Sequence, residues 1–147
     1  MKFSENRIRH YFELAKNACY YSDNKRTRVG CILVYKGQVL SIGWNCENKT
    51  NPVQKRYNSL RDYDPNASGD RSTLHAEMMA MLRARRLDID WRNVNMFVCR
   101  IRKDDSIGMS KPCPACRGYA IKLGIRNFYF TTNDGWSFEK SIWRLTR

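Results

Sequence analysis

Residues 74–82 read LHAEMMAML, and this stretch decides the fold. It predicts a helix with two chemically reactive side chains at its start. Its leucine, alanine and methionine residues are strong helix formers. His75 and Glu77 stand two positions apart, and in mid-helix such residues point to nearly opposite sides. Both can serve one site only at the helix end, where side chains from different sides lean over the terminus. We therefore expect this helix to present its start, and not its flank, to a functional site.

The expected bounds of this helix are residues 73–86. Thr73 or Ser72 is expected to cap its start by accepting a hydrogen bond from a backbone N–H of the first turn. The run RARR near its end places positive charge at the negative end of the helix dipole. A start capped in this way puts His75 and Glu77 in the first turn.

The residues that follow alternate between strand and helix patterns. Residues 93–101 (NVNMFVCRI) and 125–131 (IRNFYFT) are typical of strands. Residues 112–123 between them are typical of a helix, with proline near the start and Gly124 just past the end. Strands that alternate with helices predict an α/β fold with parallel strands in the sheet.

Upstream, the chain predicts a helix and then a hairpin. Residues 7–21 carry apolar side chains at helical spacing, namely Ile8, Tyr11, Phe12, Ala15 and Cys19. Residues 29–35 and 38–44 are two β-rich runs on either side of Lys36 and Gly37, which predicts a hairpin.

Residues 45–72 are polar, with two prolines and many turn-forming residues. A connection this long inside a compact domain is usually a lid, a binding loop or a disordered excursion. The chain has 147 residues, of which 42% are hydrophobic, and this is enough for one domain with its own core. We expect residues 1–147 to form a single domain in which 45–72 is a long loop or lid.

Two cysteines at the start of the second helix suit a metal ion. Cys113 and Cys116 form a C-x-x-C pair, so both thiols can reach one point near the helix start. Crossover helices between parallel strands bring successive helix N-termini to the same edge of a sheet. His75, Cys113 and Cys116 are therefore expected to converge on one Zn²⁺. Three protein ligands leave a tetrahedral zinc one open position, which is the catalytic arrangement.

Glu77 is then placed beside a zinc-held water without being a ligand. Zinc can lower the pKa of such a water to about 7, which makes hydroxide available at neutral pH. Glu77 can accept the proton and return it to a ring nitrogen and a leaving amine, which is general acid–base catalysis.

Other interpretations of these residues stay open at this point. A closed structural zinc site needs a fourth ligand, which Cys46 or Cys99 could supply. Three further interpretations are a redox-active C-x-x-C pair, a chance pairing without metal, and a zinc-stabilised binding module without activity. We interpret Cys19, Cys31 and Cys99 as buried free thiols, because they fall on apolar faces of the expected elements.

The charge of the chain favours an anionic partner. Lysine and arginine total 27 against 14 aspartate and glutamate residues, a formal charge of +13. Nucleic acid and a phosphorylated small molecule both fit this balance. No apolar run approaches the roughly 20 residues of a membrane span, and the first ten residues are polar. We therefore expect a soluble cytoplasmic protein without a membrane partner.

The two motifs together carry a family resemblance. His75-Ala76-Glu77 and Pro112-Cys113-Pro114-Ala115-Cys116 resemble the H-x-E…P-C-x-x-C signature of the zinc-dependent cytidine/deoxycytidylate deaminase superfamily. The resemblance implies a three-layer α/β/α fold around a mixed sheet of about five strands. It also implies one catalytic zinc ion, hydrolytic deamination of a nucleobase, and a homo-oligomer.

Within that superfamily, the chain is most similar to small deoxycytidylate-deaminase-like proteins of the phage type. The similarity lies in residues 43–45 (GWN), 49–52 (KTNP) and 129–136 (YFTTNDGW), although Asn51 stands where histidine is expected. It implies conversion of dCMP to dUMP and ammonia by attack of zinc-bound hydroxide on C4, and a host cytoplasmic location if a phage encodes the protein. It further implies that the Ala76 backbone amide binds the base carbonyl and that Asn45 binds the sugar.

Two substrate classes remain. A dCMP substrate needs cations for its phosphate, and the candidates are Arg26, Arg28, Lys49, Lys55 and Arg56. The alternative is a cytosine or adenine base in single-stranded DNA or RNA, which the high charge favours. Aromatic side chains that could stack on its bases are Tyr57, Tyr63, Trp136 and Trp143.

Overall fold

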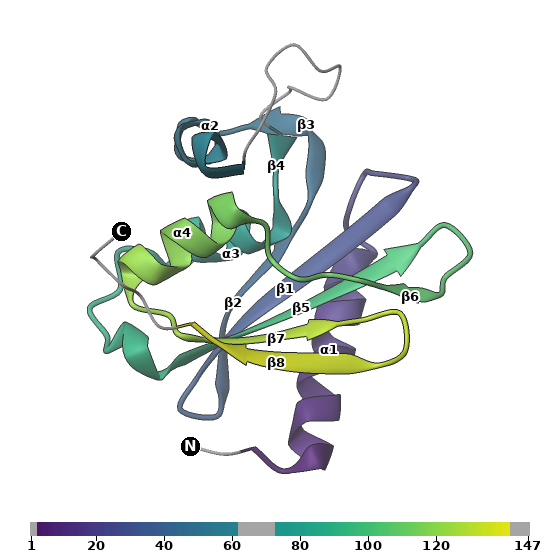
Figure 1. The fold of residues 1–147 in the computed structure, drawn as a ribbon, viewed down its shortest axis with the longest axis horizontal. Coiled ribbons are helices and arrows are strands. Elements are labelled where there is room, and N and C mark those ends of the chain that lie inside the picture. The colour runs from purple at the N-terminus through teal and green to yellow at the C-terminus, as the bar shows by residue number, and fades with distance from the viewer. Residues whose placement is uncertain (1–2, 62–72, 142–147) are drawn as a thin grey trace.

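The computed structural model describes residues 3–61 and 73–141, which form a mixed β-sheet with helices on both faces (Figure 1). The elements in chain order are α1 (Glu5–Cys19), β1 (Thr27–Tyr35), β2 (Gln38–Trp44), β3 (Cys46–Thr50), α2 (Pro52–Tyr57), the 3-10 helix η1 (Asn58–Arg61), β4 (Thr73–Leu74), α3 (Ala76–Ala84), the 3-10 helix η2 (Trp91–Asn93), β5 (Val94–Arg102), β6 (Ile107–Gly108), α4 (Pro114–Leu123), β7 (Asn127–Thr131) and β8 (Trp136–Lys140).

The main sheet has the strand order β2-β1-β5-β7-β8, and the short β6 pairs with β5. β5 and β7 are parallel, and every other pair in this sheet is antiparallel. A separate two-stranded sheet joins β3 to β4. The expected α/β fold with a mixed sheet of about five strands is confirmed.

Alternation along the strands divides the core into two layers. Cys31, Leu33 and Val98 pack against α3 and α4, while Ile32 and Phe97 pack against α1 on the other face. Side chains of successive strand residues point to opposite faces, so each central strand serves both layers. Figure 1 shows α1 on one side of the sheet and α3 and α4 on the other. None of the described helices is long and apolar enough to cross a membrane.

The expected helix and hairpin at the start of the chain are confirmed. The apolar face of α1, from Ile8 to Cys19, is buried, and Ser4 caps the helix by accepting a hydrogen bond from the Arg7 backbone N–H (3.2 Å). The hairpin turn has φ of 52° at Lys36 and 80° at Gly37. Two left-handed central residues are typical of the tight turn whose twist matches that of the flanking strands.

The prediction of a long loop over residues 45–72 is wrong for the part that the structure describes. β3, α2 and η1 occupy residues 46–61. Asn51 caps α2 by accepting a hydrogen bond from the Val53 backbone N–H (2.8 Å), and Pro52 is the first helical residue. The residues interpreted as turn formers are therefore a helix start signal. Residues 62–72 lie outside the described part of the chain, and a lid role stays a prediction.

The two helices of the site start two or three residues later than predicted. Thr73 lies in β4 and not at a cap, since β4 pairs with β3, while Ser72 lies outside the described residues. His75 itself holds the N-cap position of α3, and Cys113 holds that of α4. Gly124 ends α4 as expected, with a φ of 121°. β8 was not predicted, although its sequence WSFEK alternates aromatic and polar residues as a strand does.

Candidate active site

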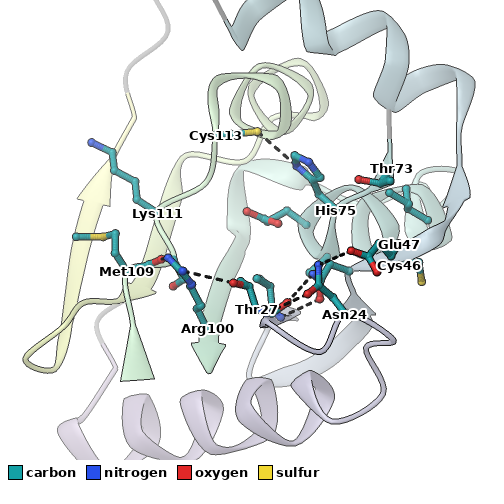
Figure 2. Close-up of a pocket in the computed structure, with 16 residues that line it drawn as sticks. Asn24, Thr27, Cys46, Glu47, Thr73, His75, Arg100, Met109, Lys111 and Cys113 are labelled. Atoms are coloured by element: carbon teal, nitrogen blue, oxygen red, sulfur yellow. Dashed lines mark hydrogen bonds between the residues drawn. The ribbon is translucent and has the colours of Figure 1, made fainter. Parts of the chain in front are cut away.

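The starts of α3 and α4 bring together the three residues predicted to bind metal. The Nδ1 atom of His75 lies 3.5 Å from the Cys113 sulfur and 3.4 Å from the Cys116 sulfur. Figure 2 shows Cys113 and His75 facing one another across the gap between the two helices. The parallel pairing of β5 with β7 places the two helix starts at one edge of the sheet.

The N-cap position explains how His75 and Glu77 serve one site. His75 has extended backbone angles (φ −83°, ψ 156°), so its side chain does not follow helical geometry. Glu77 is the second residue of α3 and is only 6% exposed. Both residues line the same pocket.

A buried amide pair on α2 and η1 holds the backbone of His75. The His75 N–H donates to Gln54 Oε1 (3.1 Å), and Gln54 Nε2 donates to Asn58 Oδ1 (2.9 Å). Both amide side chains are buried. Sequence reasoning missed them because they lie in the segment taken as a loop. The Asn-Pro helix start that precedes them is the signal that would have found them.

The pKa values of the two thiols of the C-x-x-C pair shift in opposite directions. A hydrogen bond from Cys116 and the contact with His75 together lower the pKa of Cys113 to about 4, against the effect of burial. The same hydrogen bond, with burial and the nearby Glu77 carboxylate, raises the pKa of Cys116. The lowered pKa of Cys113 favours its thiolate, which is the form that binds a metal ion.

These residues fit one zinc ion, as predicted. With Zn–S of about 2.3 Å and Zn–N of about 2.0–2.1 Å, tetrahedral geometry separates sulfur from nitrogen by about 3.5 Å. The two measured His75–sulfur distances match this value, and all three ligand atoms lie within 4.8 Å of one another. Two thiolates and an imidazole are donors that suit zinc.

A fourth protein ligand is not found among residues 3–61 and 73–141. The Cys46 sulfur contacts the Trp44 carbonyl oxygen (3.8 Å) and does not join the cluster. Cys99 lies in the other core layer, where the Cys19 thiol donates to its carbonyl oxygen (3.3 Å). Cys19, Cys31 and Cys99 are buried free thiols, which confirms their interpretation.

A cavity of about 320 Å³ opens beside the three ligands and Glu77. This is near the lower end of the roughly 300–1,000 Å³ typical of small-molecule sites, which suits one compact ligand. The residues that line it are Asn24, Thr27, Val29, Asn45, Cys46, Glu47, Thr73, Leu74, His75, Ala76, Glu77, Arg100, Met109, Ser110, Lys111 and Cys113.

Asn45 and Ala76, the residues expected to bind sugar and base, both line this cavity. Asn45 also ties the end of β2 to β1, because its Oδ1 accepts from the Val29 N–H (2.9 Å) and its Nδ2 donates to the Thr27 carbonyl (3.0 Å). Ala76 is the first residue of α3, where backbone N–H groups have no acceptor within the helix. Its N–H is therefore suited to a ligand.

Arg26 and Arg28 do not line the cavity, contrary to expectation. On β1 the cavity is lined by Thr27 and Val29, and alternate strand residues point to opposite faces. Arg28 instead lies over the Tyr20 ring (5.3 Å to its centroid) and 3.6 Å from Asp105. Lys49, Lys55 and Arg56 are also absent from the lining. The cations that do line it, Arg100 and Lys111, were missed by sequence reasoning.

Two of the aromatic residues proposed to stack on bases, Tyr57 and Trp136, do not line this cavity. Trp136 is on the α1 side of the sheet, 5.9 Å from the Phe12 ring, and Tyr57 packs against Tyr119 (5.2 Å). Tyr63 and Trp143 lie outside the described residues.

Comparison with known families gives a match over most of the chain. A family model described as the cytidine and deoxycytidylate deaminase zinc-binding region matches residues 5–132. This span contains the three zinc-ligand candidates and Glu77. No curated protein sequence matches the chain.

Solved structures share the fold at low sequence identity. One is the apo structure of a dCMP deaminase from the cyanophage S-TIM5, whose sequence is 22% identical to this chain. The two match with a TM-score of 0.62 over 88% of this chain and 86% of that one. The same enzyme with dCMP and dUMP bound is 20% identical, with a TM-score of 0.62 over 89% and 85%. A cytidine deaminase from Burkholderia pseudomallei is 19% identical, with a TM-score of 0.61 over 94% and 93%.

Proposed function

The chain belongs to the cytidine and deoxycytidylate deaminase zinc-binding family, and from this premise we propose that it converts dCMP to dUMP and ammonia. The observation that carries the proposal is the cluster of His75, Cys113 and Cys116, with Glu77 beside it in the lining of one small cavity. The binding of dCMP and dUMP by the cyanophage enzyme of the same fold supports this choice of substrate.

The proposed chemistry is hydrolysis of the amine at C4 of cytosine. His75, Cys113 and Cys116 would hold the zinc ion, which would supply an activated water at neutral pH. Glu77 would take one proton from the attacking water and pass it to the N3 ring nitrogen. As the C4–N bond breaks, Glu77 would carry the second proton, from the new C4 hydroxyl, to the departing amine. The reaction consumes one water, and the products are a uracil carbonyl and ammonia. The low exposure of Glu77 keeps bulk water away from these transfers.

The cavity lining assigns the remaining contacts. The Ala76 N–H is proposed to bind the base carbonyl, and Asn45 the sugar. Asn45 is already oriented by its two hydrogen bonds to β1, so it needs no rearrangement to present its free amide hydrogen. We also expect a homo-oligomer, which the family resemblance implies.

A polynucleotide substrate is the second candidate. The observation that favours it is the net charge of +13, because phosphate contacts dominate affinity for nucleic acid strands. The positions of Trp136 and Tyr57 away from the cavity weigh against it. The proposed mechanism at the base is the same for both substrates.

Ammonia release from a panel of substrates tests the proposal. The zinc-loaded protein is incubated separately with dCMP, with deoxycytidine, and with single-stranded oligonucleotides containing cytosine or adenine. We expect dCMP to be the best substrate. Ammonia release from oligonucleotides alone, with turnover that falls at higher salt, would replace this proposal with the polynucleotide alternative.

A further inference from the structure

We propose that Arg100 binds the 5′-phosphate of the substrate and sets a preference for nucleotide over nucleoside. This inference rests on the proposed function, because it names the group that recognises one part of that substrate. Arg100 lies near the end of β5, in the run CRIRK, and it lines the same cavity as His75 and Glu77. Figure 2 shows its side chain on the opposite side of the cavity from His75, with a dashed line to Thr27 beside it.

The guanidinium of Arg100 is only weakly bonded within the chain. One terminal nitrogen donates to the Met109 carbonyl and the other to Thr27 Oγ1, both at 3.4 Å, which is beyond the usual range for N–H···O bonds. Its Nε atom is buried and has no hydrogen-bond partner in the described part of the chain. A guanidinium offers five donors, so most of its capacity is left for a ligand.

Arg100 also has no carboxylate partner among the described residues. The other cation of the lining, Lys111, differs in this respect, because its Nζ lies 2.8 Å from Glu139 Oε2. Figure 2 shows the Lys111 amine turned away from His75. A partly buried cation without a counter-ion is unfavourable, and a phosphate supplies both the charge and the acceptors that fit the guanidinium fork.

The surrounding strands hold Arg100 in place. Its backbone N–H donates to Thr131 Oγ1 (3.2 Å), and its strand position pairs with Gly108 on β6. A side chain at position 108 would meet the Arg100 stem, since a Cβ there would lie 3.3 Å from Arg100 Cδ. The glycine therefore leaves room for the arginine to lie along β6 and reach the cavity.

The candidate contacts along the cavity then follow the order of base, sugar and phosphate in a nucleotide. The reactive base end lies at His75 and Glu77, Asn45 lies on the wall formed with β1, and Arg100 provides the phosphate end. This assignment replaces Arg26 and Arg28 as the phosphate contact. It also makes the preference for a phosphate a property of one side chain, which can be removed without touching the zinc ligands.

Binding of the reaction products tests this inference without turnover. Calorimetry compares dUMP with deoxyuridine, which differ only in the phosphate, on the zinc-loaded wild type and on Arg100→Gln. We expect the wild type to prefer dUMP by about 10- to 100-fold, the range of one charge-assisted contact. Arg100→Gln should lose that preference and keep its affinity for deoxyuridine.

Two further variants make the test specific. Arg92→Gln removes an equal charge just before the other end of β5, where the side chain is 70% exposed and pairs with Asp90, and should keep the preference. Arg100→Lys keeps the charge without the fork and should weaken dUMP binding several-fold, even if Arg100→Gln fails to fold. Wild-type preference in both folded Arg100 variants would overturn the inference and leave the deaminase proposal intact.

The wild type alone can also decide against the inference. Equal binding of dUMP and deoxyuridine, or binding of neither, overturns the phosphate role whatever the protein deaminates. Efficient deamination of dCMP together with equal binding of the two products would still support the proposed function. The failures of the two proposals are therefore distinguishable.

Discussion

Two side chains of the candidate site occupy helix-start positions that normally favour other residue types. N-cap positions favour serine, threonine, aspartate and asparagine, whose oxygens accept backbone hydrogen bonds. His75 and Cys113 hold these positions in α3 and α4, and neither side chain makes a capping hydrogen bond. Each helix thus forgoes about 1 kcal/mol of capping stabilisation. Such conflict with a local rule is expected at a functional site.

The proton transfer assigned to Glu77 predicts a variant with metal but without activity. Glu77→Gln keeps the shape of the side chain and removes its basicity, so ammonia release from dCMP should fall by about 10²- to 10⁴-fold. Zinc content, measured by elemental analysis, should stay at the wild-type value because Glu77 is not a ligand.

Glu47→Gln is the matched control for this change. Glu47 also lines the cavity, but it is exposed and accepts a hydrogen bond from Asn24. Its loss should affect the rate far less than the loss of Glu77. A Glu77→Gln protein with near wild-type turnover would show that another group carries the proton.

At the scale of elements, the site depends on how closely α3 lies on β2. Gly43 on β2 faces the first turns of α3, and a Cβ there would lie 2.2 Å from the Ala76 carbonyl oxygen. Ser41 adds a hydrogen bond from its hydroxyl to the Ala80 carbonyl (2.8 Å). This close contact fixes the position of the helix start that carries His75 and Glu77.

A pair of glycine variants distinguishes the effect of the position of α3 on the metal site from a general loss of stability. Gly43→Ala forces α3 away from the sheet, which should lower the free energy of unfolding by about 1–3 kcal/mol and also weaken zinc binding. Gly30→Ala creates the same clash on the other face, where a Cβ would lie 2.1 Å from the Ala15 carbonyl of α1. It should cost similar stability.

The two variants should differ at the metal site. Urea unfolding gives the stability of each variant, and competition with a chromogenic chelator gives its zinc affinity. Gly30→Ala should keep the wild-type zinc affinity. Equal zinc affinity in both variants would mean that the position of α3 does not depend on Gly43.

In the molecule as a whole, the two faces of the sheet have different roles. One packs against α1, and the other carries the candidate metal ligands at its edge. The layer between the sheet and α1 is apolar and aromatic, with Phe97 stacked on Tyr129 (4.3 Å between centroids). The layer with α3 and α4 carries the candidate metal ligands at its edge. A metal at that point links two helices that otherwise meet mainly through the core.

Removal of zinc is therefore expected to destabilise the whole domain. One ion per chain should be found by elemental analysis. At free zinc about 1,000-fold above its Kd, binding contributes about 4 kcal/mol, so a chelator should lower the Tm by at least about 5 °C. Cys113→Ser should show little further loss on chelation. An unchanged wild-type Tm after complete removal of the metal would contradict this view.

The sequence by itself determined the hairpin, the alternation of α3, β5, α4 and β7, and the three candidate metal ligands. Periodicity, turn residues and motif spacing are local properties, so they can be read without coordinates. The same local patterns placed the starts of α3 and α4 two or three residues too early, and the cap and first residue of α2 were taken for turn residues. They also missed β8, whose alternating pattern is only five residues long.

Only the tertiary structure decided which residues share the cavity with the metal ligands. Gln54 reaches the His75 backbone across 21 positions, and Arg100 reaches Thr27 across 73. Arg28 does not line the cavity, because alternation on β1 turns its side chain to the other face. Side-chain direction and contacts between distant residues depend on the assembled sheet, and a run of basic residues in the sequence contains neither.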